Sequence, residues 1–145
     1  MKLRLALAQI NPTVGDLEGN AALIKQSVEQ AVGAGAHIAI FPEMVLTGYP
    51  VEDLALRPSF QVASKSALAA LASELDKKIV SIVGYLDQVD GKPQNMVAVI
   101  AEGEVKARYA KCHLPNYGVF DEFRNFVAGD STLVVRIHGV DVGIA

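Results

Sequence analysis

The chain has 145 residues, of which 51% are hydrophobic and 20% charged, and its net charge at neutral pH is −3. A chain of this length fits one domain, and its slightly acidic balance gives no reason to expect a nucleic acid or an anionic membrane as partner. The longest uncharged stretch, residues 30–42, is too short for a transmembrane helix, and the N-terminus has no signal-peptide pattern.

The cysteine and histidine content argues against a disulfide and against a metal site. A single cysteine cannot form an internal disulfide, so we expect a cytoplasmic protein. His37, His113 and His138 are far apart in the sequence, and no CxxC or HxxxH pair is present. We therefore expect no metal site in this chain.

The first part of the chain predicts a strand, a turn and a helix. In "LRLALAQI" (3–10) the leucines alternate at period two, which predicts a strand. "NPTVGDLEGN" (11–20) combines Asn, Pro, Gly and Asp and predicts a turn. A helix is expected next, because an apolar stripe lies opposite Lys25, Gln26, Glu29 and Gln30. That stripe consists of Leu23, Ile24, Ser27, Val28, Ala31 and Val32.

The remainder alternates between further strands and one helix. "IAIF" (38–41) is short and continuously apolar, which predicts a strand covered on both faces. A helix is expected at about residues 60–76, and a hairpin with its turn at Glu102-Gly103-Glu104. This order predicts an α/β fold with helices packed on a mixed sheet. The segments expected to form strands after that helix are 78–86, 94–111 and 131–145.

The last six residues, "VDVGIA", form an apolar strand in this prediction. Natural domains seldom stop inside a strand, because the backbone groups of that strand then lack partners. We therefore expect Ala145 to be a truncation point and residues 1–145 to be the N-terminal part of a larger domain.

Three side chains are candidates for chemistry. In "YAKCHLPNYGVFDE" (109–122), Cys112 is adjacent to His113, and adjacent side chains in an extended chain point to opposite faces. A cysteine nucleophile needs its base within hydrogen-bond reach, so we interpret Cys112 as a half-buried thiol without a catalytic role. Lys111 alone is typical of a solvated charge. Glu43 follows a buried strand, where sites in α/β proteins collect, but it is equally typical of the surface.

Taken together, these stretches resemble the nitrilase superfamily of carbon–nitrogen hydrolases. "IAIFPEMVLTGY" resembles the glutamate motif of that superfamily, and "YAKCHLPNYGVFDE" resembles its lysine motif. "LALAQINPTVGDLEGN" also fits. "GYPVEDLALRPSF" and "LPNYGVFDEFRNF" are similar to the glutaminase domain of glutamine-dependent NAD⁺ synthetases. The resemblance covers essentially the whole chain, in the expected order.

The resemblance implies an α-β-β-α sandwich and a Glu–Lys–Cys triad. By motif position Glu43 is the general base, and Lys111 stabilises the oxyanion of the tetrahedral intermediate. Cys112 does not match the nucleophile. The resemblance places that cysteine after the final strand, beyond Ala145, so we expect the isolated chain to be inactive.

Two further residues receive roles from the resemblance. Glu122 matches a second glutamate that supports the lysine, although a surface ion pair with Arg124 or Lys106 is an alternative. Tyr117 matches an aromatic residue of the substrate pocket, although a loop tyrosine can also pack for structural reasons. Tyr49 and Glu52 are expected near the pocket mouth, without assigned roles.

The implied function is the release of ammonia from glutamine through a thioester. A downstream synthetase domain then uses this ammonia, with ATP and Mg²⁺, to convert deamido-NAD⁺ to NAD⁺, and the resemblance implies a homo-oligomer. No cofactor is expected in this chain itself. One alternative is a stand-alone amidase or nitrilase of the same superfamily. Another is a non-catalytic interaction module that keeps the fold and has lost its nucleophile.

Overall fold

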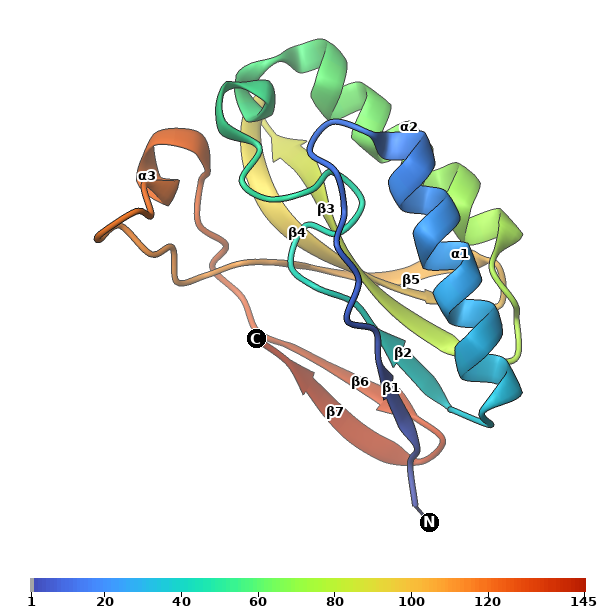
Figure 1. The fold of residues 1–145 in the computed structure, drawn as a ribbon. Helices are drawn as coiled ribbons and strands as arrows, with labels where there is room; N and C mark the ends of the chain where they lie inside the picture. The colour runs from blue at the N-terminus through green and yellow to red at the C-terminus, as the bar shows by residue number, and fades with distance from the viewer. Residues whose placement is uncertain (1) are drawn as a thin grey trace.

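The computed structural model describes residues 2–145. Two long helices lie on one side of a five-stranded sheet, and a separate hairpin lies on the other side (Figure 1). The elements in chain order are β1 (Leu5–Leu7), α1 (Leu17–Gly33), β2 (Ile38–Ile40), the 3₁₀-helix η1 (Glu52–Leu56), α2 (Pro58–Glu74), β3 (Val80–Val89), β4 (Lys92–Ala101), β5 (Glu104–Ala110), α3 (Glu122–Asn125), β6 (Leu133–Ile137) and β7 (Val140–Ile144).

The five-stranded sheet is mixed, as the sequence predicts. Its strand order is β1-β2-β3-β4-β5. The first three strands are parallel, because α1 and α2 each carry the chain back to the same edge. Strands β3, β4 and β5 form an antiparallel meander. The hairpin of β6 and β7 forms a second, two-stranded sheet.

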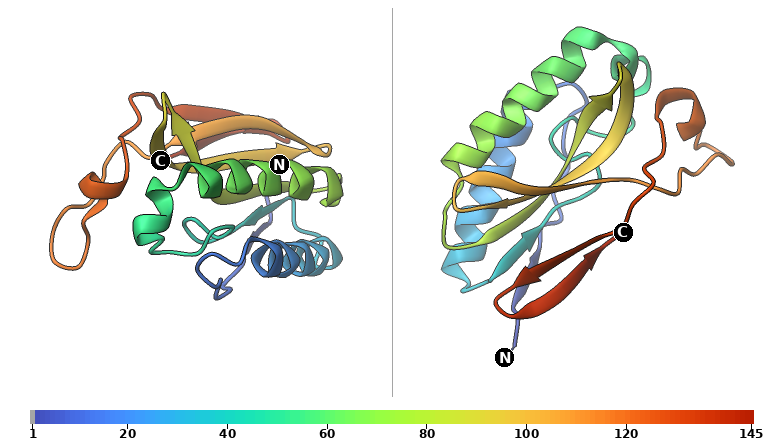
Figure 2. Two further views of the ribbon diagram at one scale, coloured as in Figure 1. Left: turned by 90° about the horizontal axis from the view of Figure 1, so that it is seen from above. Right: turned by 180° about the vertical axis from the view of Figure 1, so that it is seen from behind.

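These elements stack in three layers. Seen from above, the helices, the five-stranded sheet and the β6–β7 hairpin follow one another (Figure 2). The α/β prediction is therefore confirmed, and the described residues supply an α-β-β arrangement consistent with one side of an α-β-β-α sandwich.

Strand β2 is buried from both sides, which confirms the interpretation of its continuous apolar sequence. Ala39 belongs to the core that the helices cover. Its neighbour Ile38 belongs to the core beneath β6 and β7. Successive side chains of a strand point to opposite faces, so the same three residues contribute to two separate cores.

Several boundaries differ from the predicted ones. Helix α1 begins at Leu17, inside the predicted turn, because the Asp16 side chain accepts a hydrogen bond from the Gly19 N–H at 2.9 Å and caps the helix. Strands β3 and β4 are joined at Asp90-Gly91, a two-residue turn with positive φ at both residues, which the sequence analysis did not identify. The short η1 and α3 were also not predicted.

No helix within residues 2–145 combines the length and apolar character needed to cross a membrane.

Candidate active site

Glu43 lies in the loop that follows β2, as predicted. The loop comes very close to the middle of β3, at Gly84. A Cβ atom at Gly84 would lie 2.3 Å from the Met44 backbone nitrogen, so only glycine allows this approach. The Leu46 N–H also donates to the Gly84 carbonyl, at 3.1 Å. On the other side of Glu43, the Phe41 N–H donates to the Ile82 carbonyl at 3.2 Å, so β3 holds the backbone both before and after Glu43.

The same loop is held from the N-terminal side by the buried side chain of Asn20, in α1. Its amide donates to the carbonyls of Thr13 and Leu46, at 2.8 Å and 3.1 Å, and its oxygen accepts from the Thr13 N–H. Buried polar groups of this kind are costly to leave unpaired, so the bonds define one loop conformation.

Lys111 follows the last residue of β5. Its N–H donates to the Asn95 carbonyl of β4 at 2.9 Å, which continues the ladder by one residue. Its own carbonyl accepts from the Gly129 N–H at 2.9 Å. Gly129 packs so closely that a Cβ there would lie 2.4 Å from the Ala110 carbonyl oxygen. The lysine backbone is therefore held on both sides.

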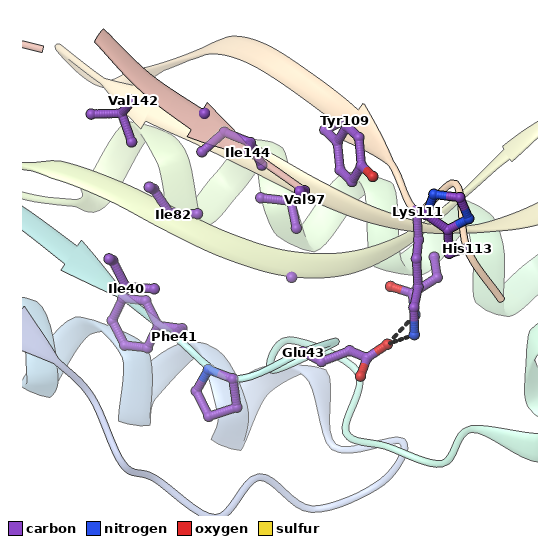
Figure 3. Close-up of a pocket in the computed structure, with 15 residues that line it drawn as sticks. Ile40, Phe41, Glu43, Ile82, Val97, Tyr109, Lys111, His113, Val142 and Ile144 are labelled. Carbon is purple, nitrogen blue, oxygen red and sulfur yellow. Dashed lines mark hydrogen bonds and ion pairs between the residues drawn. The ribbon is translucent and has the colours of Figure 1, made fainter. Parts of the chain in front are cut away.

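Glu43 and Lys111 meet from these two elements (Figure 3). The Lys111 Nζ lies 2.6 Å from Oε1 of Glu43. The Asn95 Nδ2 donates to the same oxygen, also at 2.6 Å. Oε1 therefore takes two donors, whereas Oε2 accepts no hydrogen bond from residues 2–145. One carboxylate oxygen remains available to accept a proton.

Glu122 lies on the other side of Lys111. Its carboxylate is 3% exposed, and both of its oxygens lie 3.1 Å from the Lys111 Nζ. Tyr49 donates its hydroxyl to Oε1 of Glu122 at 2.9 Å. The alternative of a surface pair does not hold in this structure, because Arg124 pairs with Asp53 and Lys106 pairs with two other glutamates.

The surroundings keep Lys111 positively charged and Tyr49 neutral. Partial burial lowers the pKa of Lys111, but hydrogen bonds to Glu43 and Glu122 and the charges of both carboxylates outweigh it, so the pKa lies above its ordinary value. Burial raises the pKa of Tyr49, and its hydrogen bond to Glu122 and the nearby carboxylates raise it further. The ammonium has three N–H groups. Two donate to Glu43 and Glu122, so one remains for a ligand.

A cavity of about 490 Å³ opens beside this cluster. Glu43, Asn95, Tyr109, Lys111 and His113 supply its polar side chains. Figure 3 shows the apolar side chains that line the remainder, which come from both sheets. They are Ile40, Phe41, Ile82, Val97, Val142 and Ile144. A small molecule with a polar reacting end and an uncharged stem fits such a lining.

Cys112 is not among the residues that line this cavity. Its Sγ lies 3.2 Å from the Ser131 carbonyl oxygen and 3.5 Å from that of Ala110. His113 does line the cavity, so the two neighbours face different surroundings, as their adjacency suggests. A cysteine–histidine couple is not formed.

Tyr117 lies outside the cavity. Its side chain is 72% exposed, and its ring contacts Phe120 edge-on at 5.7 Å between centroids. The structure therefore brings Glu43, Lys111 and Glu122 together but leaves Tyr117 apart, and a role for it in substrate binding stays a prediction.

The sequence analysis assigned no role to Asn95, His113 or Tyr49, all of which belong to this region. Asn95 had only a weak signal, since it is a polar residue at the start of the apolar run "MVAVI" (96–100). Tyr49 was expected only near the pocket mouth and His113 was considered only beside Cys112, because their contacts depend on segments distant in the sequence. In residues 2–145, no group of three or more His, Cys, Asp or Glu side chains is arranged to hold a metal ion.

The comparison with protein families accounts for this arrangement. The family model for carbon–nitrogen hydrolases matches residues 4–145. The chain belongs to the carbon–nitrogen hydrolase family. The resemblance inferred from the glutamate and lysine motifs is thereby confirmed, and the Glu43–Lys111 pair belongs to a carbon–nitrogen hydrolase fold.

Among curated relatives, this carbon–nitrogen hydrolase is similar to glutamine-dependent NAD⁺ synthetases. It is 42% identical to that of Thermotoga maritima over 99% of the chain, and 38% identical to that of Aquifex aeolicus over 99%. The matches cover 25% of each relative. The chain thus spans about a quarter of the length of the curated relatives it matches.

Two solved structures share the fold. A glutamine-dependent NAD⁺ synthetase from Acinetobacter baumannii, in complex with ADP, superposes with a TM-score of 0.91 at 39% identity, covering 97% of this chain and 27% of that one. An amidase from Nesterenkonia sp. AN1 superposes with a TM-score of 0.81 at 25% identity, covering 97% of this chain and 54% of that one. In that structure the acetamide moiety of fluoroacetamide is covalently added at the active-site cysteine.

Proposed function

We propose that residues 2–145 form the acid–base part of a site that hydrolyses the side-chain amide of glutamine. In the proposed reaction sequence, the natural polypeptide uses the released ammonia to convert deamido-NAD⁺ to NAD⁺. The observation that carries the proposal is the Glu43–Lys111–Glu122 cluster at the edge of the cavity. The similarity to glutamine-dependent NAD⁺ synthetases over nearly the whole chain supports the choice of substrate.

The proposed reaction needs a cysteine thiol as nucleophile, supplied by a residue other than Cys112. Oε2 of Glu43, which is free of hydrogen bonds from the described residues, takes the thiol proton, and the sulfur attacks the amide carbon. The same carboxyl then returns the proton to the amide nitrogen, the C–N bond breaks and ammonia leaves. Water hydrolyses the resulting thioester to glutamate, again with Glu43 as base, and the thiol is restored.

Lys111 has a different role in this reaction. Its raised pKa keeps it cationic, and its remaining N–H stabilises the negative oxygen of the tetrahedral intermediate. Glu122 holds the ammonium from the buried side, so the lysine cannot rotate away. Because this oxygen carries full charge only in the transition state and the intermediate, the effect falls on kcat rather than on KM.

We further propose that a downstream synthetase domain binds ATP and Mg²⁺, and that the natural polypeptide forms a homo-oligomer in the cytoplasm. The length of the synthetase relatives supports a downstream domain. Light scattering of the natural polypeptide measures its oligomeric state.

The decisive experiment compares two sources of nitrogen in the natural polypeptide that contains this sequence. With Glu43→Gln or Lys111→Met, we expect NAD⁺ formation from glutamine to fall by at least about 10²–10³-fold. Formation from added ammonium chloride should be unchanged, because the synthetase step does not use these residues. Glu29→Gln, an exposed glutamate of α1, is the matched control and should leave both activities unchanged.

Each rival function predicts another outcome. A stand-alone amidase, favoured by the similarity to the Nesterenkonia enzyme, releases ammonia but forms no NAD⁺ from either source. A non-catalytic module shows no dependence on Glu43 or Lys111. Glutamine-dependent activity that survives both substitutions would falsify the proposed function.

A further inference from the structure

Asn95 is a buried amide at the start of the apolar half of β4. The residue is 4% exposed, and it is followed in β4 by Met96, Val97 and Ala98. Polar side chains are rarely buried unless a partner compensates them. Its partner is Oε1 of Glu43, at 2.6 Å from Nδ2. Since a carboxylate only accepts hydrogen bonds, the nitrogen of the amide must face Glu43.

Asn95 contacts both members of the Glu43–Lys111 pair. Its side chain donates to Glu43, whereas its backbone carbonyl accepts from the Lys111 N–H at 2.9 Å. Glu43 and Lys111 are 68 residues apart in the sequence. One residue of β4 therefore links the loop after β2 with the end of β5.

We propose that Asn95 is a positioning residue that selects Oε2 of Glu43 as the base. The inference rests on the proposed function, because it needs Glu43 to accept a proton. Oε1 is occupied by Lys111 and Asn95, and these two donors fix the plane of the carboxylate. Without Asn95, the lysine alone is a single anchor, about which the carboxylate can turn. Either oxygen can then face the ammonium, and the free oxygen loses its fixed direction.

The charge state of the donor makes this role specific. A neutral amide can hold a carboxylate without neutralising it, whereas a second cation would compete with Lys111.

Loss of a positioning contact of this kind costs roughly 10²-fold in rate when the reacting groups move by about 1 Å. The backbone carbonyl of residue 95 is present in every variant, so a substitution there removes the Glu43 contact and leaves the Lys111 anchor in place.

The test uses two substitutions in the natural polypeptide, with glutamine-dependent NAD⁺ formation as readout. Asn95→Leu has similar size and no donor, and we expect kcat to fall roughly 10²-fold with KM unchanged. Asn95→Asp can donate to Glu43 only while its new carboxyl is protonated. We therefore expect the ratio of its kcat to that of the parent to fall as the pH rises from 5 to 8. Asn95→Leu should show no such fall.

Asn116→Asp is the matched control. It makes the same change from amide to carboxylate at an exposed residue whose side-chain oxygen only accepts a hydrogen bond, from the Phe123 N–H. We expect parental activity at every pH. Ammonium-dependent NAD⁺ formation, measured in parallel, reports whether the synthetase step is intact, and urea unfolding reports whether each variant is folded.

The outcomes separate this inference from the proposed function. If Glu43→Gln keeps full activity, the proposed function is wrong and the inference goes with it. If Glu43→Gln is inactive while both Asn95 variants keep the parental kcat, only the inference is overturned. If Asn95→Leu does not fold, the pH dependence of Asn95→Asp decides: a ratio that does not change with pH overturns the positioning role.

Discussion

The two faces of the five-stranded sheet differ in how they are covered. Between the sheet and the two helices, Ile24 of α1, Leu68 of α2 and Val83 of β3 are at most 2% exposed. The opposite face is covered by the β6–β7 hairpin at Ile38, Ile82 and Ile137, and beside this cluster lies the cavity of about 490 Å³. One face is filled, whereas the other leaves room for a ligand.

This difference shows how one sheet divides stability and chemistry. Close packing against α1 and α2 fixes the positions of the strands. The strands should therefore keep these positions when side chains on the cavity face change. Glu43 and Lys111 lie where the strands leave the partly covered face, so their loops approach the cavity from a rigid support. Changes on the helix side should alter stability, and changes on the cavity side should alter activity.

The largest expected effect comes from Gly84→Ala, on the cavity side. The new Cβ would lie 2.3 Å from the Met44 nitrogen, so the loop with Glu43 must move away from β3. We expect glutamine-dependent activity to fall roughly 10²-fold and the free energy of unfolding to fall by about 1–3 kcal/mol. Steady-state kinetics and urea unfolding measure the two effects.

Gly33→Ala is the control for this change. No atom lies within 4 Å of a Cβ at Gly33, which belongs to α1. We expect an unchanged activity and a free energy of unfolding higher by about 0.5–1 kcal/mol. Equal losses of activity in the two glycine variants would contradict the division between the faces.

A matched pair of valines tests the division through stability. Val83, fully buried under the helices, and Val97, half-buried beside the cavity, lie on adjacent strands. We expect Val83→Ala to lower the free energy of unfolding by roughly 2–3 kcal/mol and Val97→Ala by about 1 kcal/mol. Chemical denaturation of both variants measures this difference, and a larger loss at Val97 would reverse the assignment.

The smallest expected effect concerns Tyr49, whose hydroxyl donates a hydrogen bond to the buried carboxylate of Glu122. Tyr49→Phe removes the hydrogen bond at 2.9 Å, and we expect a loss of about 1 kcal/mol in the free energy of unfolding at neutral pH. The pKa of Tyr49 is raised from its ordinary value of 10.0, so above that pH the unfolded chain loses the proton first. At such a pH the folded state binds more protons than the unfolded state, so the free energy of unfolding falls as the pH rises.

The difference between parent and Tyr49→Phe should therefore be full below pH 10 and should shrink as the pH rises through the raised pKa. Lys111 titrates in both proteins and cancels in the comparison. Urea unfolding between pH 8 and pH 11 measures the difference. A constant difference over this range would show that the hydroxyl contributes nothing that depends on its proton.

Much of the fold could be predicted from local sequence patterns. The alternating leucines near the N-terminus, the apolar run at 38–41 and the helical stripe of α1 are periodic, and periodicity determines which face is buried. The positions of Glu43 and Lys111 followed from motifs whose residues are contiguous. Glu122 could be aligned with a motif, but its burial against Lys111 was one of two alternatives until the chain was folded.

The remainder depends on contacts between distant segments. Nothing near Asn95 in the sequence indicates that Glu43, 52 residues away, is its partner. The hydrogen bond between Tyr49 and Glu122 spans 73 residues. Tyr117 fails to reach the cavity because its loop extends from the body of the fold, which no local pattern reveals (Figure 1). Helix boundaries shifted for a simpler reason, since Asp16 was treated as part of a turn rather than as a cap.

The topology of the sheet also has a consequence for the order of folding. Strands β3, β4 and β5 are joined by two-residue turns, at Asp90-Gly91 and Glu102-Gly103, so their contacts are local and close quickly. Strands β1 and β2 must wait for long crossovers through the helices. Lys111 therefore belongs to the segment expected to form early, and Glu43 to the segment expected to form late. The Glu43–Lys111 pair is complete only when the slowest contacts have formed, so a partly folded chain presents the lysine without its carboxylate partner.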